Sequence, residues 1–283
     1  MSDFILTIIT VNLNNVKGLE KTVKSVINQT SCDFEFIIID GASTDGSRDV
    51  IELYREKITY SISEPDKGIY HAMNKGIAAA KGEYLLFLNS GDWLASNTVL
   101  EQSFSQPFTE DIVSGDIYFY DTVKEEVRWH VPSPEKLTAK TLLLGTLPHQ
   151  ATFIKRSLFE TYGLYNESLK IASDWLFFLE VLLEHGCSYR HLPVTVSYFA
   201  MDGISCSPET AGLPRREQLG VLEKKYPRFL PDYERLQQLE NETAAWKSSR
   251  EYRAYRVLKR IGVISCTVFF VRVMRWTKRK FKS

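Results

Sequence analysis

The chain has 283 residues, of which 44% are hydrophobic and 25% are charged, and its 35 basic and 35 acidic side chains give no net charge. These values are ordinary for a globular protein with one large domain, or one domain with an appendage. Its four cysteines are far apart and form no Cys-x-x-Cys pair, which argues against a zinc site or a disulfide framework. The first residues carry no basic signal-peptide segment, so we expect a cytoplasmic protein in a reducing compartment.

Strand-like and helix-like patterns alternate through the first third of the chain. Short apolar runs read as strands that are buried on both faces, and the segments between them have the apolar spacing of helices. We expect Ser47 to cap the second helix. This order predicts an α/β fold with a mostly parallel central sheet and right-handed crossovers. The predicted strands cover 5–11, 34–40, 58–63 and 84–88, and the predicted helices cover 19–28, 47–55 and 69–80.

The rest of the chain is less regular. Pro193 is expected to interrupt the last strand, and the Gly-, Ser- and Pro-rich segment 200–213 is expected to be a loop or a lid. Helical patterns resume near Pro214. The predicted strands here cover 111–120 and 188–199, and the predicted helices cover 155–162 and 173–185.

Three predicted strands end in polar turns, at Thr10–Asn12, Asp40–Gly41 and Asn89–Asp92. A single Asp at such a place is more often a helix cap, but several at one sheet edge favour a nucleotide pocket. Asp92 is placed where a lone carboxylate could help to hold a divalent cation against a phosphate. No Gly-x-Gly-x-x-Gly fingerprint or P-loop occurs, so dinucleotide and P-loop chemistry are disfavoured.

The order and spacing of several polar blocks carry a resemblance to a known family. They are Ile5 to Asn12, Ile39 to Ser47, Ser63 to Tyr70, Ala72 to Gly76 and Gly82 to Tyr84, with weaker matches at His149-Gln150, Ser173 to Trp175 and Gly203 to Ser205. The chain resembles glycosyltransferase family 2, which implies the GT-A fold. We therefore expect a catalytic domain over 1–212, with a nucleotide-sugar half (1–95) and an acceptor half (96–212), followed by a helical, basic extension over 213–283.

The resemblance implies roles for individual residues. Asp40 would accept a hydrogen bond from the uracil of a UDP-sugar, Asp92 would bind Mn²⁺ or Mg²⁺ that bridges the diphosphate, and Asp174 would be the general base. The donor pocket would also hold Thr10, Asn12, Asp66, Lys67, Asn74, Asn89, Ser90 and Gly91. The implied reaction is inverting transfer of a hexosyl or N-acetylhexosaminyl group to a hydroxyl of a glycan or lipid-linked acceptor, in bacterial cell-surface polysaccharide biosynthesis.

Departures from the family pattern bear on these roles. Gly41 stands where a second carboxylate is common, and His71 stands where an acid is common. The family often reads Asp-x-Asp-Asp where this chain reads Asn89-Ser90-Gly91-Asp92, so one acidic metal ligand remains. These differences keep open a non-catalytic nucleotide-sugar-binding or scaffold protein of the same fold. A nucleotidyltransferase is disfavoured, since no Gly-rich phosphate loop follows the first strand.

Several side chains have a structural interpretation beside the functional one. Asp174 could merely cap its helix, and His149 could be a hydrogen-bonded loop residue instead of a substrate or diphosphate contact. Trp93, Trp129 and Trp175 are expected in the core; Trp93 and Trp175 are kept as possible substrate contacts, with Trp93 preferred because it adjoins the site.

The end of the chain is strongly basic. Residues 247–282 hold twelve Lys or Arg and one acid, Glu251, so the rest of this neutral chain is acidic. The apolar run 261–271 is too short to span a bilayer, which needs about 20 residues. Read as an amphipathic helix, this tail would contact a membrane surface; the alternatives are a helix packed on the body or, less favoured because of the apolar content, a nucleic-acid arm.

Overall fold

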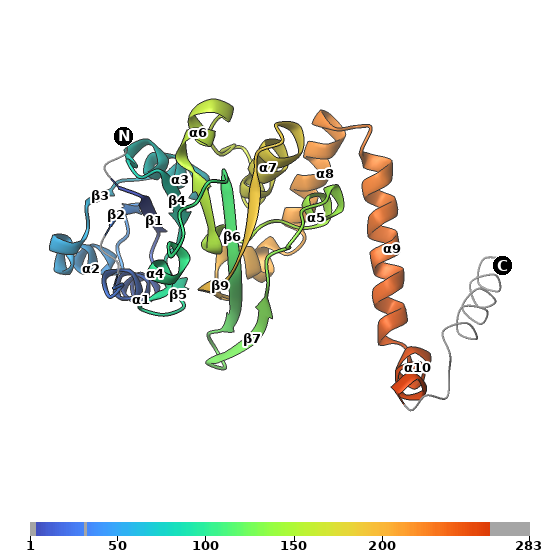
Figure 1. Ribbon diagram of the computed structural model, residues 1–283. Helices are drawn as coiled ribbons and strands as arrows, with labels where there is room; N and C mark the ends of the chain where they lie inside the picture. Colours follow the sequence, from blue (N-terminus) through green and yellow to red (C-terminus); the bar gives the residue numbers. More distant parts are fainter. Residues whose placement is uncertain (1–3, 31–32, 261–283) are drawn as a thin grey trace. The chain divides into compact units, whose positions relative to one another are not determined.

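The structure is a computed structural model that describes residues 4–30 and 33–260 (Figure 1). Over these residues, nine strands form one sheet with the order β3-β2-β1-β4-β8-β6-β9-β5, and β7 pairs with β6. The strands are β1 (Leu6–Asn12), β2 (Phe34–Asp40), β3 (Tyr60–Ser63), β4 (Tyr84–Phe87), β5 (Trp93–Leu94), β6 (Ile112–Asp121), β7 (Glu126–Val131), β8 (Thr152–Lys155) and β9 (Tyr189–Ala200). The helices are α1 (Val16–Ile27), α2 (Ser47–Leu53), α3 (Ile69–Ala79), α4 (Val99–Ser103), α5 (Ala139–Leu144), α6 (Arg156–Tyr162), α7 (Ser173–Leu179), α8 (Leu213–Lys225), α9 (Leu230–Ser248) and α10 (Arg250–Arg260).

The predicted α/β fold with a mostly parallel sheet is confirmed. β1 lies between β2 and β4, and all four of the first strands run parallel. Asn12 pairs in register with Asp40, and the backbone N–H of Ser90 donates to the Val11 carbonyl. The carboxyl ends of the three strands, with their polar turns, therefore meet at one edge of the sheet. The sheet becomes mixed beyond β4, because β8 is antiparallel to both β4 and β6.

Alternate residues of the central strands pack into two separate cores, which explains their continuously apolar sequences. Ile8, Ile38 and Leu86 face one cluster, which includes the buried stripe of α1. Ile9 and Ile39 face the other cluster, which includes buried residues of α3 and α7. Burial on both faces fixes the register of β1, since a slip by one residue would exchange the two sets.

The structure corrects two local predictions. Pro193 does not interrupt β9, because a shift in the β6–β9 register between Ser114 and Asp116 takes up the extra residues. Ser47 does not cap α2; Gly46 holds that position, and Ser47 instead donates its N–H and hydroxyl to Asp45. The predicted helix over 173–185 is present as α7 followed by a π-helical turn at Glu180–Glu184.

The chain divides into two compact units, with the division after Pro227. The first contains the sheet and α8, and the second contains α9 and α10. Within the described residues, no helix has the length and apolar character needed to cross a bilayer. The apolar run 261–271 lies outside the described residues, and the assignment of functional domains stays a prediction.

Candidate functional site

The carboxyl ends of β1 and β2 are closed around Asp40. Its Oδ1 accepts hydrogen bonds from Asn12 Nδ2 (2.8 Å) and Ser43 Oγ (2.6 Å), and its Oδ2 accepts from the Ser43 N–H (3.0 Å) and Ser63 Oγ (2.6 Å). Burial alone would raise the pKa of this carboxyl, but the four hydrogen bonds outweigh it and hold the pKa below its usual value of 3.8. Asp40 is fully buried, so a uracil contact would have to replace one of these donors. In the structure Asp40 anchors the turn after β2.

Thr10 and Asn12 are also buried in this edge of the sheet. Thr10 Oγ1 donates to the Leu88 carbonyl (2.7 Å), which ties β1 to the chain just after β4. Asn12 uses its amide nitrogen on Asp40 and Ser43, and its Oδ1 is buried without a hydrogen-bond partner. Since an unpaired buried acceptor is costly, Asn12 Oδ1 is a polar group of this edge that a donor from a ligand could satisfy.

Gly41 makes room for the Asp66 carboxylate. A Cβ atom at Gly41 would lie 2.5 Å from Asp66 Oδ2 and 3.1 Å from Leu13 Cδ1, so a larger residue here would require the Asp66 side chain to move. Asp66 Oδ1 accepts the Gly68 N–H (2.9 Å), which fixes the turn before α3. The acid that the family pattern places beside Asp40 is therefore absent from position 41, and the Asp66 carboxylate fills the adjoining space.

The turn after β4 presents Asp92 from a rigid support. Gly91 has a φ of +106°, which favours glycine, and its N–H donates to Thr22 Oγ1 of α1 (3.0 Å). Thr22 in turn donates to the Asp92 carbonyl (2.6 Å), and Asn15 Nδ2 donates to the Ser90 carbonyl (3.0 Å). These bonds use backbone atoms of the turn and attach it to α1 and its N-cap. The side chains of Asn89 and Asp92 can therefore make other contacts.

Asp92 is buried like Asp40, but fewer hydrogen bonds offset the cost of burying its charge. Burial raises the pKa of its carboxyl to about 7, although the Ala200 N–H, the nearby His149 ring and the Gln150 side chain lower it. Its Oδ1 accepts the Ala200 N–H at the end of β9 (2.9 Å). A carboxyl group that is this strongly perturbed at a strand end marks a functional-site candidate.

A chain of hydrogen bonds joins this turn to Asp174. Asn89 Nδ2 lies 3.3 Å from His149 Nε2, and His149 Nδ1 lies 3.2 Å from Asp174 Oδ2. With the Asn89 amide in this orientation, the neutral His149 tautomer that satisfies both contacts accepts at Nε2 and donates from Nδ1 to Asp174. The Tyr70 hydroxyl donates to Asp174 Oδ1 (2.9 Å) and to the Ile171 carbonyl (2.6 Å). Both oxygens of Asp174 are therefore fixed in orientation.

Asp174 is not the cap of α7. The N-cap position is Ala172, and no side-chain cap hydrogen bond occurs there. Asp174 lies in the first turn of α7, almost buried, with its oxygens directed to Tyr70 and His149. Burial and the charge of Asp174 together raise the pKa of the Tyr70 hydroxyl well above 10, so this hydroxyl stays a donor.

Two other residues that were predicted to line the donor pocket, Asn74 and Lys67, lie on α3 and just before it. Asn74 is buried on α3, where its amide donates to the Tyr165 carbonyl and to Glu167 and its Oδ1 accepts the Tyr165 N–H. This pattern ties α3 to the segment after α6 and gives Asn74 a structural role. Lys67 is exposed, and its backbone N–H donates to His71 Nδ1 (3.2 Å), so its ammonium remains available to an anion at the entrance to α3.

The three tryptophans have three different environments. Trp175 is 2% exposed and donates its indole N–H to the Leu142 carbonyl (2.7 Å), so it is a core residue that offers no face to a substrate. Trp93 is half-buried; its ring stacks on Tyr198 at 4.8 Å and has the Lys21 ammonium 3.0 Å from its centroid. Trp129, predicted in the core, is instead 53% exposed on β7. β7 is an outer strand that pairs only with β6 in the described sheet.

A divalent cation at this edge would find few protein ligands. In the described part of the chain, no group of three or more His, Cys, Asp or Glu side chains could hold a metal ion. Two candidate oxygens in the turn after β4 are the buried Asp92 carboxylate and Asn89 Oδ1, which is buried without a hydrogen-bond partner. This set fits a cation of the Mg²⁺ type, which commonly takes one or two carboxylates and completes its shell with phosphate oxygens and water.

Sequence reasoning placed Tyr70 in a motif but gave it no role. Its contact with Asp174 joins residues 104 positions apart, and no local pattern announces such a pair. The available signal was its place in the first turn of α3, next to the polar edge of the sheet. His149, kept above only as a possible contact, proves to lie between Asn89 and Asp174.

Comparisons with known proteins agree on the family. A family model described as glycosyl transferase family 2 matches residues 7–163. The chain is 30% identical over 206 residues to a PGL/p-HBAD biosynthesis glycosyltransferase of Mycobacterium tuberculosis, and this alignment covers 70% of the chain and 78% of the relative. It is 31% identical over 226 residues to an uncharacterized glycosyltransferase of the same species, and that alignment covers 78% of the chain and 85% of the relative.

Two solved structures share the fold. The S. aureus protein TarS (residues 1–349), in complex with UDP-GlcNAc, has a TM-score of 0.57 and 20% identity, and the match covers 69% of this chain and 58% of that one. The mannosyltransferase PcManGT from Pyrobaculum calidifontis, in complex with GDP-Man and Mn²⁺, has a TM-score of 0.56 and 17% identity, covering 90% and 83%. The strand-end geometry, the matched family model and these relatives lead to one conclusion: the chain belongs to glycosyl transferase family 2 and is a nucleotide-sugar-dependent glycosyltransferase with a GT-A-like fold.

Proposed function

We propose that this enzyme transfers a hexosyl or N-acetylhexosaminyl group, with inversion, from a UDP-linked donor to a hydroxyl of a glycan or lipid-linked acceptor in cell-surface polysaccharide biosynthesis. The observation that carries the proposal is the hydrogen-bond chain from Asn89 through His149 to Asp174. It joins the turn where a diphosphate would bind to a single fixed carboxylate, which is the arrangement that one-step displacement requires.

Asp174 is proposed as the general base. The acceptor oxygen attacks the anomeric carbon, the bond from that carbon to the diphosphate oxygen breaks, the acceptor proton passes to a carboxylate oxygen of Asp174, and the nucleoside diphosphate leaves. The Tyr70 hydroxyl and His149 hold the carboxylate in place while it receives the proton. A single base with no nucleophile beside it supports inversion at the anomeric carbon.

Asp92, with Asn89 Oδ1 near it in the chain, would hold Mn²⁺ or Mg²⁺. When bound, the cation would supply positive charge to the leaving diphosphate. Asp92 is suited to this task because its buried carboxyl lacks a cationic partner strong enough to offset burial. Lys67, exposed beside Asp66, would add positive charge at the entrance to the pocket.

The base assignment is tested with the Asp174→Asn variant. We expect turnover of the UDP-sugar to fall by about 10²- to 10⁴-fold, because the amide cannot accept the proton, while the affinity for UDP with Mn²⁺ stays within twofold. The donor is first chosen by thermal stabilisation of the wild-type enzyme with a panel of nucleotide sugars in Mn²⁺. Near-normal turnover in the variant would remove Asp174 from the mechanism.

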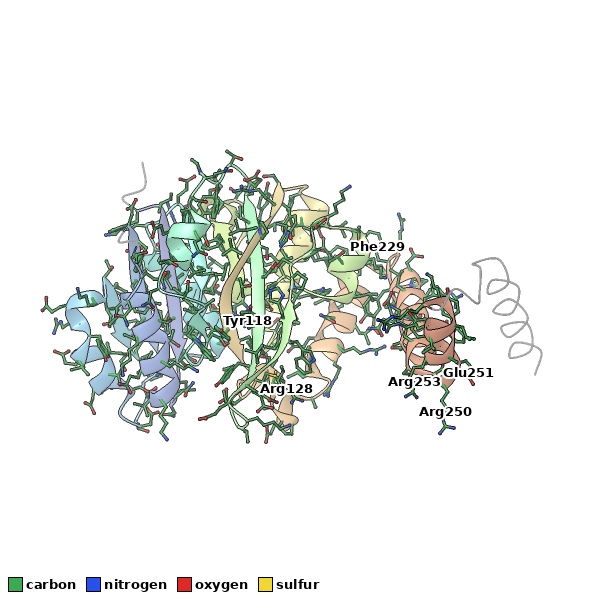
Figure 2. All side chains as sticks on the ribbon, turned by 60° about the horizontal axis from the view of Figure 1, so that its bottom comes forward. Tyr118, Arg128, Phe229, Arg250, Glu251 and Arg253 are labelled. Atoms are coloured by element: carbon green, nitrogen blue, oxygen red, sulfur yellow. The ribbon has the colours of Figure 1, made fainter. Side chains whose placement is uncertain are left out.

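The basic helix α10 is proposed as a membrane-surface contact, which would suit a lipid-linked acceptor. Tyr252, Tyr255 and Leu258 lie on its less exposed face, and its Arg and Lys side chains are exposed. Figure 2 shows Arg250 and Arg253 projecting outward from this helix. We expect sedimentation with vesicles that contain anionic lipid, weakened by salt, and none with neutral vesicles; equal sedimentation with both would contradict the proposal.

A further inference from the structure

The segment that leads into α7 is held from two sides. On one side, the Tyr70 hydroxyl donates to the Ile171 carbonyl (2.6 Å). On the other side, the Glu217 carboxylate of α8 accepts three consecutive backbone N–H groups: Oε1 from Lys170 (2.7 Å), and Oε2 from Ile171 and Ala172 (3.0 Å each). Asp174 follows two residues after this clamp.

The clamp holds the chain just before α7. The N-cap of this helix is Ala172, so Glu217 accepts the N–H of the N-cap and of the two residues that precede it, Lys170 and Ile171. Among the described residues it does not accept from the first helical turn, where the N–H of Asp174 points to the Tyr70 hydroxyl (3.5 Å). Hydrogen bonds to a charged acceptor are stronger than neutral ones, so three of them on one carboxylate order the segment that leads into α7.

The position of α7 sets the position of Asp174. Asp174 lies in the first turn of this helix, so a shift of residues 170–172 moves its carboxylate relative to Tyr70 and His149. In the described part of the chain, the hydrogen bonds of Glu217 all come from backbone N–H groups, and none joins it to Asp174 or to the turn at Asn89–Asp92. Misplacement by about 1 Å can cost on the order of 100-fold in rate.

We propose that Glu217 is a positioning residue for the transfer reaction. Through this residue, α8 would help to position the proposed base. The proposal rests on the role of Asp174 given above. It predicts that Glu217 affects turnover and hardly affects donor binding, because the clamp orders the base-bearing segment and leaves the strand-end pocket untouched.

The test compares Glu217→Gln and Glu217→Ala with Glu223→Gln. Glu223 is an acid on the same helix, exposed and without a hydrogen bond or ion pair among the described residues, so its variant removes the same charge. We expect turnover of the chosen UDP-sugar to fall about tenfold in Glu217→Gln and about 100-fold in Glu217→Ala, with UDP and Mn²⁺ affinity within twofold. Glu223→Gln should match the wild type.

Coupling to Asp174 separates positioning from a general loss of stability. In an Asp174→Asn background, Glu217→Gln should cause no further loss of turnover, since the group that it positions is already inactive. A full additional tenfold loss there would overturn the proposal. If Asp174→Asn alone keeps near-normal turnover, the proposed base is wrong, and the clamp is then judged by the measurement below.

Amide hydrogen exchange tests the clamp without any turnover. Glu217→Gln should speed exchange at Lys170, Ile171 and Ala172 by at least tenfold, while the amides of β1 and β4 stay protected as in the wild type. Unchanged exchange at these three amides would overturn the proposal whatever the donor. Faster exchange throughout the sheet would also overturn it, because Glu217 would then serve overall stability.

Discussion

Asp40 and Asp92 follow neighbouring parts of the same sheet edge, and both are buried, yet their surroundings are opposite. Asp40 receives four hydrogen bonds, and the pKa of its carboxyl is held low. Asp92 receives the Ala200 N–H and a Gln150 contact, and the pKa of its carboxyl is raised to about 7. Burial penalises both charges, and the number of donors decides the result.

This difference suggests a structural role for Asp40 and a ligand-binding role for Asp92. The Asp40 carboxylate is already satisfied by the protein and stabilises the turn after β2. The buried Asp92 carboxylate and the unpaired Asn89 Oδ1 are two acceptors that a bound cation would satisfy, while a proton on Asp92 relieves its burial below about pH 7. Of these two buried carboxylates, Asp92 has fewer protein partners and is the better candidate for ligand chemistry.

Among the tests of this comparison, the largest expected effect comes from Asp92→Asn. Turnover should fall by about 10²- to 10³-fold, because the stabilisation of the leaving diphosphate is lost. The extra thermal stabilisation that Mn²⁺ gives in the presence of UDP, about 2.7 kcal/mol at 100 times Kd, should disappear. Asp40→Asn is the matched comparison, and its Mn²⁺ dependence should remain. Equal loss of Mn²⁺ dependence in both variants would break the distinction between the two carboxylates.

Gly41→Asp should be the next most damaging change. The added Cβ would lie 2.5 Å from Asp66 Oδ2, so we expect a loss of about 1–3 kcal/mol in the free energy of unfolding and weaker UDP binding. The double variant Gly41→Asp with Asp66→Ala should recover most of this stability, measured by urea unfolding against Asp66→Ala alone. A double variant as unstable as Gly41→Asp would show that the clash with Asp66 is not the cause.

The smallest expected effect is the pH dependence of Asp40. Because the pKa of its carboxyl is below 3.8 in the folded state, its charge stabilises the fold above about pH 4 and this contribution is lost as the pH falls through the lower folded value. Asp40→Asn should cost about 1–2 kcal/mol at pH 6 and progressively less below pH 4, measured by urea unfolding. A difference that grows on acidification would contradict the assignment.

The strong local patterns made the first half of the fold predictable. β2 has the predicted bounds, β4 and α3 each end one residue early, and β1 is shifted by one residue, because continuous apolar runs and helical spacing are local signals. The strands β5, β7 and β8 were missed. β5 has only two residues, and β7 is held by its pairing with β6 alone in the described sheet. The predicted break at Pro193 was wrong because a bulge accommodates this residue, and the sequence of a single strand does not reveal a bulge.

The site was predictable as a set of positions but not as a network. Strand-end reasoning and the family pattern brought Asp40, Asp92 and Asp174 forward. The partners that define their behaviour come from far away in the chain: Ser63 for Asp40, Ala200 for Asp92 and Tyr70 for Asp174. One of them is a backbone amide, which no residue pattern identifies. The sequence therefore proposes candidate carboxylates, but it does not reveal which of them has a raised pKa.

The bulge near Pro193 has a consequence for how this enzyme can vary in length. After the bulge, β9 pairs with β6 residue by residue up to Tyr120 and Ala200, and the Ala200 amide is the one that reaches Asp92. Deleting a single residue after the bulge, between Ser197 and Ala200, would withdraw that amide and turn the residues after the deletion to the opposite face. Insertions in the 122–125 turn, by contrast, would change neither contact. Lineages that diversify this scaffold should thus tolerate length changes at the tip of the β6–β7 hairpin and preserve the residue count from the bulge to Ala200.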